Sequence, residues 1–392
     1  MMGKPKIRFK GYNEDWEQRK LGEVLKERTK RAQGGEELLS VTIANGVIRQ
    51  ADSEKRNIAS EDKSNYKIVR KGDIPYNSMR MWQGAVGNSE YDGIVSPAYT
   101  VLVPTDEANA KFFMEYFKKE NSLQLFQRWS QGLTSDTWNL KYPTLSSMRF
   151  SMPSIEEQNR IASYFEQLDH LITLHQHKCD EMKKLKKCML QKMFPQNGKK
   201  VPEIRFEGFT NDWEQRKLGE VLKERTKRAQ GGEELLSVTI ANGVIRQADS
   251  EKRNIASEDK SNYKIVRKGD IPYNSMRMWQ GAVGNSEYDG IVSPAYTVLV
   301  PTDEANAKFF MEYFKKENSL QLFQRWSQGL TSDTWNLKYP TLSSMRFSMP
   351  SIEEQNRIAS YFEQLDHLIT LHQHKCDELQ NLKKYMLQNM FV

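Results

Sequence analysis

The feature that most constrains the fold of this chain is an internal duplication. Residues Asp15–Glu181 recur letter for letter as Asp212–Glu378, at a constant offset of 197 positions (212 − 15). The similarity extends outwards, because residues 5–12 resemble residues 202–209. Nearly the whole chain is therefore one unit written twice, and two identical units tend to arrange themselves about a two-fold axis. Such an arrangement suits a two-fold symmetric partner, and duplex DNA carrying an inverted repeat is the leading candidate.

The composition is that of a soluble globular protein, with 38% hydrophobic and 28% charged residues. No apolar run approaches the roughly 20 residues that span a bilayer, and the start Met1-Met2-Gly3-Lys4-Pro5-Lys6 lacks an apolar signal core. We therefore expect a cytoplasmic protein without a membrane partner. The three cysteines (Cys179, Cys188 and Cys376) fall in helical pattern without metal-ligand spacing, which predicts reduced thiols rather than a disulfide or zinc framework.

Charge alone favours a polyanionic partner only weakly. The net charge is +7 and the isoelectric point about 9.0, but residues 15–150 carry 20 Lys and Arg against 18 Asp and Glu. Any DNA contact must therefore come from the placement of charge.

Each copy begins with a mixed globular part that runs to about Phe150. Short apolar runs bounded by turn residues predict strands. A longer amphipathic stretch predicts one or two helices whose aromatic residues pack in the core. The expected strands are Leu38–Ile43, Tyr66–Val69, Gly84–Gly87, Ile94–Val95 and Tyr99–Val103, and the expected helical region is Ala110–Trp129.

A long helix follows each globular part. Ser154 and Glu157 have the spacing of a capping box, and no Pro or Gly occurs between Ile155 and Phe194. A helix of that span is about 57 Å long at 1.5 Å per residue. Apolar or small residues recur at steps of three and four, interrupted by Lys186. The expected seam comprises Ile161, Phe165, Leu168, Ile172 and His175, with copies Ile358, Phe362, Leu365, Ile369 and His372, and continues at Cys179 and Cys376.

The nearest available partner for one seam is the second helix of the same chain, so we predict that the two helices pack antiparallel. The alternative is a parallel zipper between two copies of the chain. The predicted fold class is α+β: two mixed α/β domains separated by two long helices that form an antiparallel coiled coil, with internal pseudo-two-fold symmetry. The expected boundaries are 1–150 (first domain), 151–197 (helix and linker), 198–350 (second domain) and 351–392 (second helix).

The sequence contains none of the enzyme motifs that would indicate catalysis. It has no G-x-x-x-x-G-K-[ST] phosphate loop and no glycine fingerprint for a nucleotide cofactor. Asp73-Ile74-Pro75-Tyr76 is only superficially like the Asp-Pro-Pro-Tyr loop of adenine methyltransferases, and we interpret it as a strand end before a turn. His170, His175 and His177 do not share one helix face, which argues against a metal site.

Two polar loops remain as candidate DNA contacts, residues 76–84 and 129–141. Arg can bind guanine bidentately, Asn and Gln can bind adenine, and Ser or Thr can bind base or phosphate. The candidate base-reading residues are Asn77, Arg80, Trp82, Gln83, Thr134, Ser135 and Asn139, with copies Asn274, Arg277, Trp279, Gln280, Thr331, Ser332 and Asn336. The candidate phosphate contacts are Lys141, Lys338, Arg49 and Arg246, and the basic cluster 26–31 is either a further contact or a solvated helix end.

Several motifs are similar to those of one known family. Residues 8–23 resemble the opening of a target-recognition domain, especially in staphylococcal members, and Lys71-Gly72-Asp73-Ile74 is similar to the central Gly-Asp-Ile segment of such domains. Residues 153–162 (PSIEEQNRIA), running on to Leu168–Ile172, are similar to the start of the long spacer helix. In this order the chain resembles, over its full length, the specificity (S) subunit of type I restriction–modification systems.

The resemblance implies a non-catalytic subunit with no cofactor of its own. Each recognition domain would read one half of a bipartite DNA site, and the helices would set the gap between the halves. Two methyltransferase (M) subunits would dock on the helices and methylate adenine N6 with S-adenosylmethionine, and restriction (R) subunits would supply ATP- and Mg-dependent activity. The candidate docking residues are Leu171, Leu174 and Leu185.

The chain departs from the family pattern in one respect, because its two recognition domains are identical over Asp15–Phe150. We therefore predict a palindromic bipartite target with an adenine in each half. The alternatives are a self-contained DNA methyltransferase or nuclease, which the missing cofactor loop disfavours, and a symmetric coiled-coil scaffold that binds only protein.

Overall fold

The computed structural model describes residues 3–53, 59–196, 199–250 and 256–392, which form two compact units. Unit 1 comprises Met1–Gln176 and His374–Val392, and unit 2 comprises His177–Gln373. Each unit thus contains one globular domain, the first part of the helix that follows it, and the last part of the other long helix. The C-terminal part of each long helix therefore lies in the unit that contains the other globular domain. The predicted boundaries 1–150, 151–197, 198–350 and 351–392 follow the sequence and do not include this exchange.

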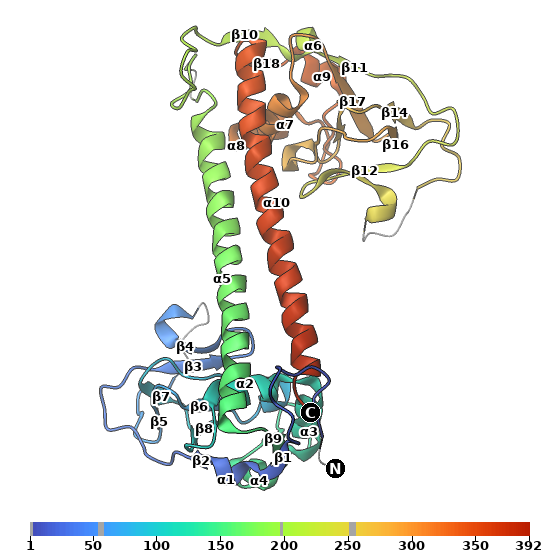
Figure 1. Cartoon of the computed structure of the whole chain (residues 1–392). Helices are drawn as coiled ribbons and strands as arrows, with labels where there is room; N and C mark the ends of the chain where they lie inside the picture. Colours follow the sequence, from blue (N-terminus) through green and yellow to red (C-terminus); the bar gives the residue numbers. More distant parts are fainter. Residues whose placement is uncertain (1–2, 54–58, 197–198, 251–255) are drawn as a thin grey trace. The chain divides into compact units, whose positions relative to one another are not determined.

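The globular domain of unit 1 is built from short antiparallel strands and small helices (Figure 1). A three-stranded sheet has the order β2-β8-β6, and three separate pairs are β1-β9, β3-β4 and β5-β7. The strands are β1 (Glu17–Lys20), β2 (Leu25–Glu27), β3 (Leu39–Thr42), β4 (Gly46–Arg49), β5 (Lys67–Val69), β6 (Ile74–Asn77), β7 (Gly93–Val95), β8 (Tyr99–Pro104) and β9 (Arg149–Met152). The helices are α1 (Leu21–Val24), α2 (Ala110–Lys118), α3 (Glu120–Trp129) and α4 (Tyr142–Ser147).

The globular domain of unit 2 repeats this topology, with the sheet order β11-β17-β15 and the pairs β10-β18, β12-β13 and β14-β16. Its strands are β10 (Glu214–Lys217), β11 (Leu222–Glu224), β12 (Leu236–Thr239), β13 (Gly243–Arg246), β14 (Lys264–Val266), β15 (Ile271–Asn274), β16 (Gly290–Val292), β17 (Tyr296–Pro301) and β18 (Arg346–Met349). Its helices are α6 (Leu218–Val221), α7 (Ala307–Lys315), α8 (Glu317–Trp326) and α9 (Tyr339–Ser344).

Four of the five expected strand regions contain strands, and the fifth does not. Residues Gly84–Gly87 make only a single bridge, between Val86 and Tyr76. The prediction of a strand there was wrong because Gly84 adopts φ 85° and closes a turn instead. The helical region Ala110–Trp129 is two helices, because Lys119 leaves the helical conformation with ψ 141°.

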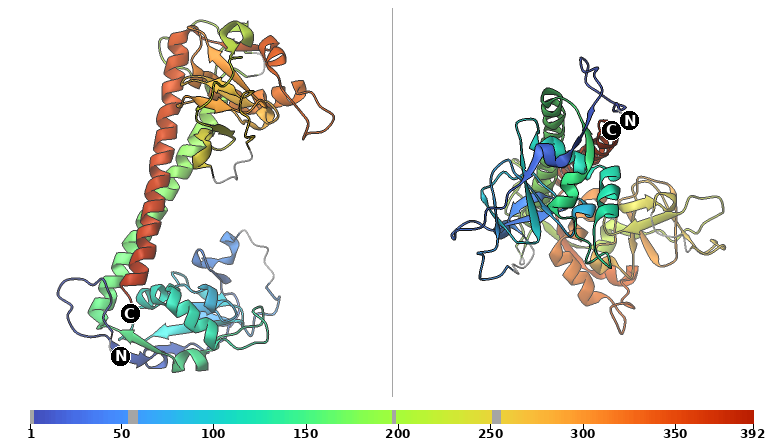
Figure 2. Two further views of the ribbon diagram at one scale, coloured as in Figure 1. Left: turned by 90° about the vertical axis from the view of Figure 1, so that its right-hand side faces the viewer. Right: turned by 90° about the horizontal axis from the view of Figure 1, so that it is seen from below.

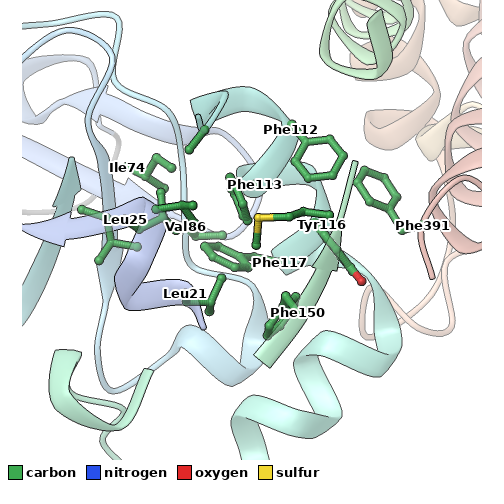
Figure 3. Close-up of a cluster of buried hydrophobic side chains, with 14 of the residues drawn as sticks. Leu21, Leu25, Ile74, Val86, Phe112, Phe113, Tyr116, Phe117, Phe150 and Phe391 are labelled. Carbon is green, nitrogen blue, oxygen red and sulfur yellow. The ribbon is translucent and has the colours of Figure 1, made fainter. Parts of the chain in front are cut away.

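The core of unit 1 is aromatic and includes the end of the chain (Figure 3). Helix α2 contributes Phe112, Phe113, Tyr116 and Phe117, in line with the predicted aromatic face. Phe391 inserts beside them, with its ring centre 4.8 Å from that of Tyr116. Because it is 2% exposed and burying such a ring stabilises by roughly 1.5–3 kcal/mol, the chain end is an integral part of this core.

The two long helices are α5 (Ile155–Lys192) and α10 (Ile352–Asn389). Within unit 1, Phe165 lies 5.8 Å from Phe391 between ring centres, Asp169 binds Lys383 at 2.7 Å, and Ile172 lies beside Cys376. As the residue numbers rise along α5, those of the residues they contact at the end of the chain fall. This confirms the prediction that the two helices are antiparallel. Figure 2 shows the C-terminal end of α10 in this unit.

Unit 2 contains the same contacts with the helices exchanged. The rings of Phe194 and Phe362 are 6.1 Å apart, Lys186 binds Asp366 at 2.8 Å, and Cys179 lies beside Ile369. The seam residues that lie nearest the globular domains are buried, namely Ile161, Phe165 and Leu168 with copies Ile358, Phe362 and Leu365. The next ones, Ile172, His175, Ile369 and His372, are half-buried.

The interruption of the seam at Lys186 has a structural cause. Its Nζ lies 2.8 Å from Glu312 in α7 and 2.8 Å from Asp366 in α10. Glu312 is 2% exposed in its side chain, so the lysine supplies the positive charge that this buried carboxylate requires. The charged position in the heptad therefore holds the helix end against the globular domain.

The predicted capping box is only partly formed. The Ser154 Oγ accepts from the Glu157 backbone N–H at 3.5 Å, a long contact, but the Glu157 carboxylate does not reach back. It accepts two hydrogen bonds from Arg8 instead, both at 2.7 Å. This bidentate pair is the stronger interaction, and it ties the N-terminal segment to the start of α5. Within the described residues, no helix is both long and apolar enough to cross a membrane.

Candidate nucleic-acid interface

The first polar loop starts where β6 ends and is held by its own backbone. The Asn77 side-chain oxygen accepts from the Met79 backbone N–H at 3.0 Å, and a 3-10 turn over Met81–Gln83 follows. Arg80 is exposed, and its Nη1 donates to Gln83 Oε1 at 3.1 Å. A short 3-10 turn thus presents an Arg and an amide side by side. These are the two kinds of group that read guanine and adenine edges.

The second polar loop is closed at its base by a bridge between Gln131 and Asn139, with backbone hydrogen bonds of 3.1 and 2.8 Å. Inside it, the Thr134 N–H donates to Thr137 Oγ1 at 3.1 Å. A Cβ on Gly132 would lie 2.6 Å from the Thr137 carbonyl oxygen, so only glycine fits there. Ser135 and Thr134 are exposed at the tip.

The structure brings the two loops together. The Leu140 N–H donates to the Ser78 carbonyl at 2.8 Å, and the rings of Trp82 and Trp138 pack edge to face with centres 5.2 Å apart. The indole N–H of Trp82 donates to the Met79 carbonyl at 3.1 Å. Trp82 therefore uses its only hydrogen-bond donor inside the protein, and its ring serves to join the two loops.

The open groove beside the first loop of unit 2 has a volume of about 1370 Å³. Asn274, Arg277 and Gln280 line one side of it, as predicted residues of the first loop. The hairpin β12–β13, residues around Tyr263 and the segment Ser293–Tyr296 form the rest of the wall, which also carries Asp249 and Asp259. A concave surface with an Arg and several amides facing inwards is suited to binding the edges of bases.

The second loop borders a separate, smaller hollow of about 410 Å³ in unit 2. Asn336 and Lys338 line it, whereas Thr331 and Ser332 line neither hollow. Among the described residues, the amide oxygens of Asn139 and Asn336 are buried without a hydrogen-bond partner. An acceptor of this kind has a cost of roughly 1–3 kcal/mol until a donor reaches it.

The candidate phosphate contacts differ in whether their charged groups already pair with other residues of the protein. Lys141 is exposed at the start of α4 and makes no ion pair within the described part of the chain. Arg49 already pairs with Glu37 at 3.3 Å and lies over the Tyr91 ring, 4.9 Å from its centre. From the basic cluster, Arg28 donates two hydrogen bonds to the buried Asp73, at 2.7 and 2.8 Å, and this carboxylate raises the pKa of Arg28. Arg28 thus has a structural partner.

Sequence reasoning missed the hairpin as a wall of the groove. Its uncharged polar residues Ser237, Thr239 and Asn242 line the hollow together with Ile240. The Asn-Gly pair at its tip is a sequence signal for a hairpin turn, but an alternating strand pattern does not tell which face meets a ligand. Elsewhere in the described ranges, no group of three or more His, Cys, Asp or Glu residues could hold a metal ion.

The chain thus consists of a duplicated α+β domain, long helices that pair within each unit, and polar loops beside an open groove. The family model for the type I restriction modification DNA specificity domain matches the chain twice, over residues 13–184 and 210–381. The chain therefore belongs to the type I restriction–modification specificity family, whose members recognise DNA and leave catalysis to partner subunits.

Individual relatives agree with this membership. The chain is 22% identical over 347 residues to the type I restriction enzyme MjaVIII specificity subunit of Methanocaldococcus jannaschii, covering 82% of this chain and 78% of the relative. The S subunit of a type I restriction–modification system from M. genitalium has a similar fold, with a TM-score of 0.63, 14% identity, and coverage of 100% of this chain and 99% of that one. A chain from a study of complex assembly and conformational transition of the type I R-M system has a TM-score of 0.50 at 17% identity, covering 96% and 97%.

Proposed function

We propose that each globular domain reads one half of a bipartite DNA target through the groove beside its first loop. The observation that carries this proposal is the convergence of Asn274, Arg277 and Gln280 on one open hollow of about 1370 Å³. Thr331 and Ser332 were predicted to read bases, but they line neither hollow. We therefore assign them, together with Lys338, to the DNA backbone that flanks the bases. Trp82 and Trp279 act by fixing the loops, because their indole donors are already used.

The two half-sites have the same sequence on opposite strands, so the complete target is a palindrome with an unspecified gap. The sequence identity of the two domains supports equal half-sites. The antiparallel direction of the helix segments within each unit supports their inversion. Each half contains one adenine, which a partner subunit methylates on its own strand.

The partners dock on the outer faces of the long helices. Leu171 and Leu174 are 40% and 43% exposed. Their copies Leu368 and Leu371 are 38% and 53% exposed. Leu185 instead packs against the second core, which makes it a weaker candidate. The partners are M subunits, which bind S-adenosylmethionine and flip the adenine out of the duplex, and R subunits, which bind ATP and Mg; this chain itself needs no cofactor and acts in the cytoplasm.

The test is selection of binding sites from a random duplex library by the purified complex of this chain with an M subunit of the same host. We expect a bipartite motif with two inverted halves. In the variant with Arg80→Ala and Arg277→Ala, the selected motif should lose one position in both halves. Recovery of no motif by a stable complex would favour the protein-only scaffold, and S-adenosylmethionine binding by the chain alone would favour a self-contained methyltransferase.

A further inference from the structure

The hairpin β12–β13 forms the wall of the groove that faces the first loop. Its strands pair in register from Leu236 opposite Arg246 to Thr239 opposite Gly243. The Asn242 N–H donates to Thr239 Oγ1 at 2.9 Å, which fixes the turn. At this turn Ile240 is 53% exposed, although it lines the groove. The copy in unit 1 has the same geometry, with Ile43 51% exposed.

The hairpin is mounted directly on the chain that leaves the first loop. A Cβ on Gly284 would lie 2.7 Å from the Val244 nitrogen and 2.9 Å from the Gly243 Cα, so the two backbones meet without an intervening side chain. The Gly284 N–H also donates to the Pro272 carbonyl at 3.2 Å. The hairpin tip and Arg277 thus line the same groove, and a ligand that fills the groove contacts both.

The chemistry of this wall matches the edges of base pairs. Ser237, Thr239 and Asn242 offer uncharged donors and acceptors, and Ile240 adds a branched aliphatic group with few rotamers. The major groove of DNA accepts a two-stranded β-ribbon, and the apolar group that it displays is the 5-methyl group of thymine. A phosphate-binding wall would instead carry Lys or Arg at these positions.

We propose that the hairpin enters the major groove and that Ile240, with Ile43 in the other copy, packs on the 5-methyl group of one thymine in each half-site. This inference rests on the proposed function, since it requires that the groove binds DNA. It makes the hairpin a second specificity element that distinguishes thymine from cytosine without a hydrogen bond. The contact is separate from that of Arg277, which reads a neighbouring base.

The test replaces each thymine of the selected target, one at a time, by uracil, which keeps every hydrogen-bonding group and lacks the methyl. Binding of the S–M complex to each duplex is measured by fluorescence anisotropy. We expect one thymine per half-site whose replacement weakens binding about fourfold, which corresponds to about 0.8 kcal/mol for one buried methylene-sized group. In the variant with Ile43→Ala and Ile240→Ala, that same replacement should have no further effect.

The matched control is the variant with Leu133→Ala and Leu330→Ala, which removes an exposed apolar side chain from each domain outside the groove. It should keep the uracil effect. The inference is overturned if no thymine is sensitive to uracil, or if the sensitivity persists in the isoleucine variant; in either case the selected motif still stands, and the proposed function with it. Absence of any selected motif would remove both.

Discussion

Replacement of Lys383 by Met should release the end of α10 from unit 1. Lys383 Nζ lies 2.9 Å from Glu115 Oε1 and 2.7 Å from Asp169 Oδ1. The Glu115 side chain is only 2% exposed, and its other oxygen has no partner among the described residues. The lysine is therefore the group that makes burial of this carboxylate tolerable.

The magnitude follows from the burial of the three groups. Breaking a buried ion pair from one side costs about 3–5 kcal/mol, because the remaining charge stays desolvated. Lys383 is 20% exposed and Asp169 is 47% exposed, so we expect the lower end, about 3 kcal/mol. Asp169→Asn should cost less than about 1 kcal/mol, since that partner is half in water. Adding Glu115→Gln to Lys383→Met should recover most of the loss, since the buried carboxylate is then replaced by a neutral amide.

Hydrogen exchange followed by mass spectrometry can separate the two helix ends, because their sequences differ (residues 379–389 are LQNLKKYMLQN and residues 182–192 are MKKLKKCMLQK). In Lys383→Met, the peptide 379–389 should exchange about a hundredfold faster, the equivalent of about 3 kcal/mol. The peptide 182–192 is the internal control and should not change. Unchanged exchange at 379–389, or an equal change in both peptides, would refute the reasoning.

Three further predictions concern protonation, base reading and the mounting of the hairpin. Burial lowers the pKa of Lys316 to about 8, and it also lowers the pKa of Lys119. Between pH 8 and 10.5 the unfolded chain binds protons that the folded chain lacks. The contribution of these lysines to the free energy of unfolding therefore rises with pH. Urea unfolding should show this rise in the wild type relative to the variant with Lys119→Met and Lys316→Met, and parallel profiles would contradict it. Arg80→Ala with Arg277→Ala should weaken binding of the selected DNA by about 1–3 kcal/mol per half-site, whereas Arg70→Ala with Arg267→Ala, which removes ion pairs to Asp92 and Asp289, should not; equal losses would count against base reading. Gly87→Ala with Gly284→Ala should displace the hairpin from the backbone that it packs on. The protein should still fold, but the selected motif should become less specific. An unaltered motif would show that this backbone contact is not needed.

The sequence alone was sufficient for the duplication, the long helices and their antiparallel pairing. These features depend on identity and on a period of three to four residues, which are both visible without a structure. The turn of the first loop was also predictable, because Asn77, Arg80 and Gln83 are polar residues bounded by a strand and a glycine; their contact with DNA stays a prediction.

The remaining features depend on contacts between residues far apart in sequence. Lys186 breaks the heptad pattern and can be understood only beside Glu312, which is 126 positions away. Glu157 has the spacing of a capping box, yet it binds Arg8, which is 149 positions away. The hairpin wall was missed for the same reason, because the backbone contact between Gly284 and Val244 has no sequence signature.

The most direct test of the central claim is the methylation pattern that this chain directs. The chain and an M subunit of the same host would be expressed together, and the host DNA read by single-molecule sequencing that detects N6-methyladenine. The account predicts one bipartite palindrome, with a methylated adenine on each strand at equivalent positions of the two identical halves. A bipartite motif with unlike halves would contradict the equivalence of the two domains, and no modified motif in the presence of a soluble complex would contradict the recognition function itself.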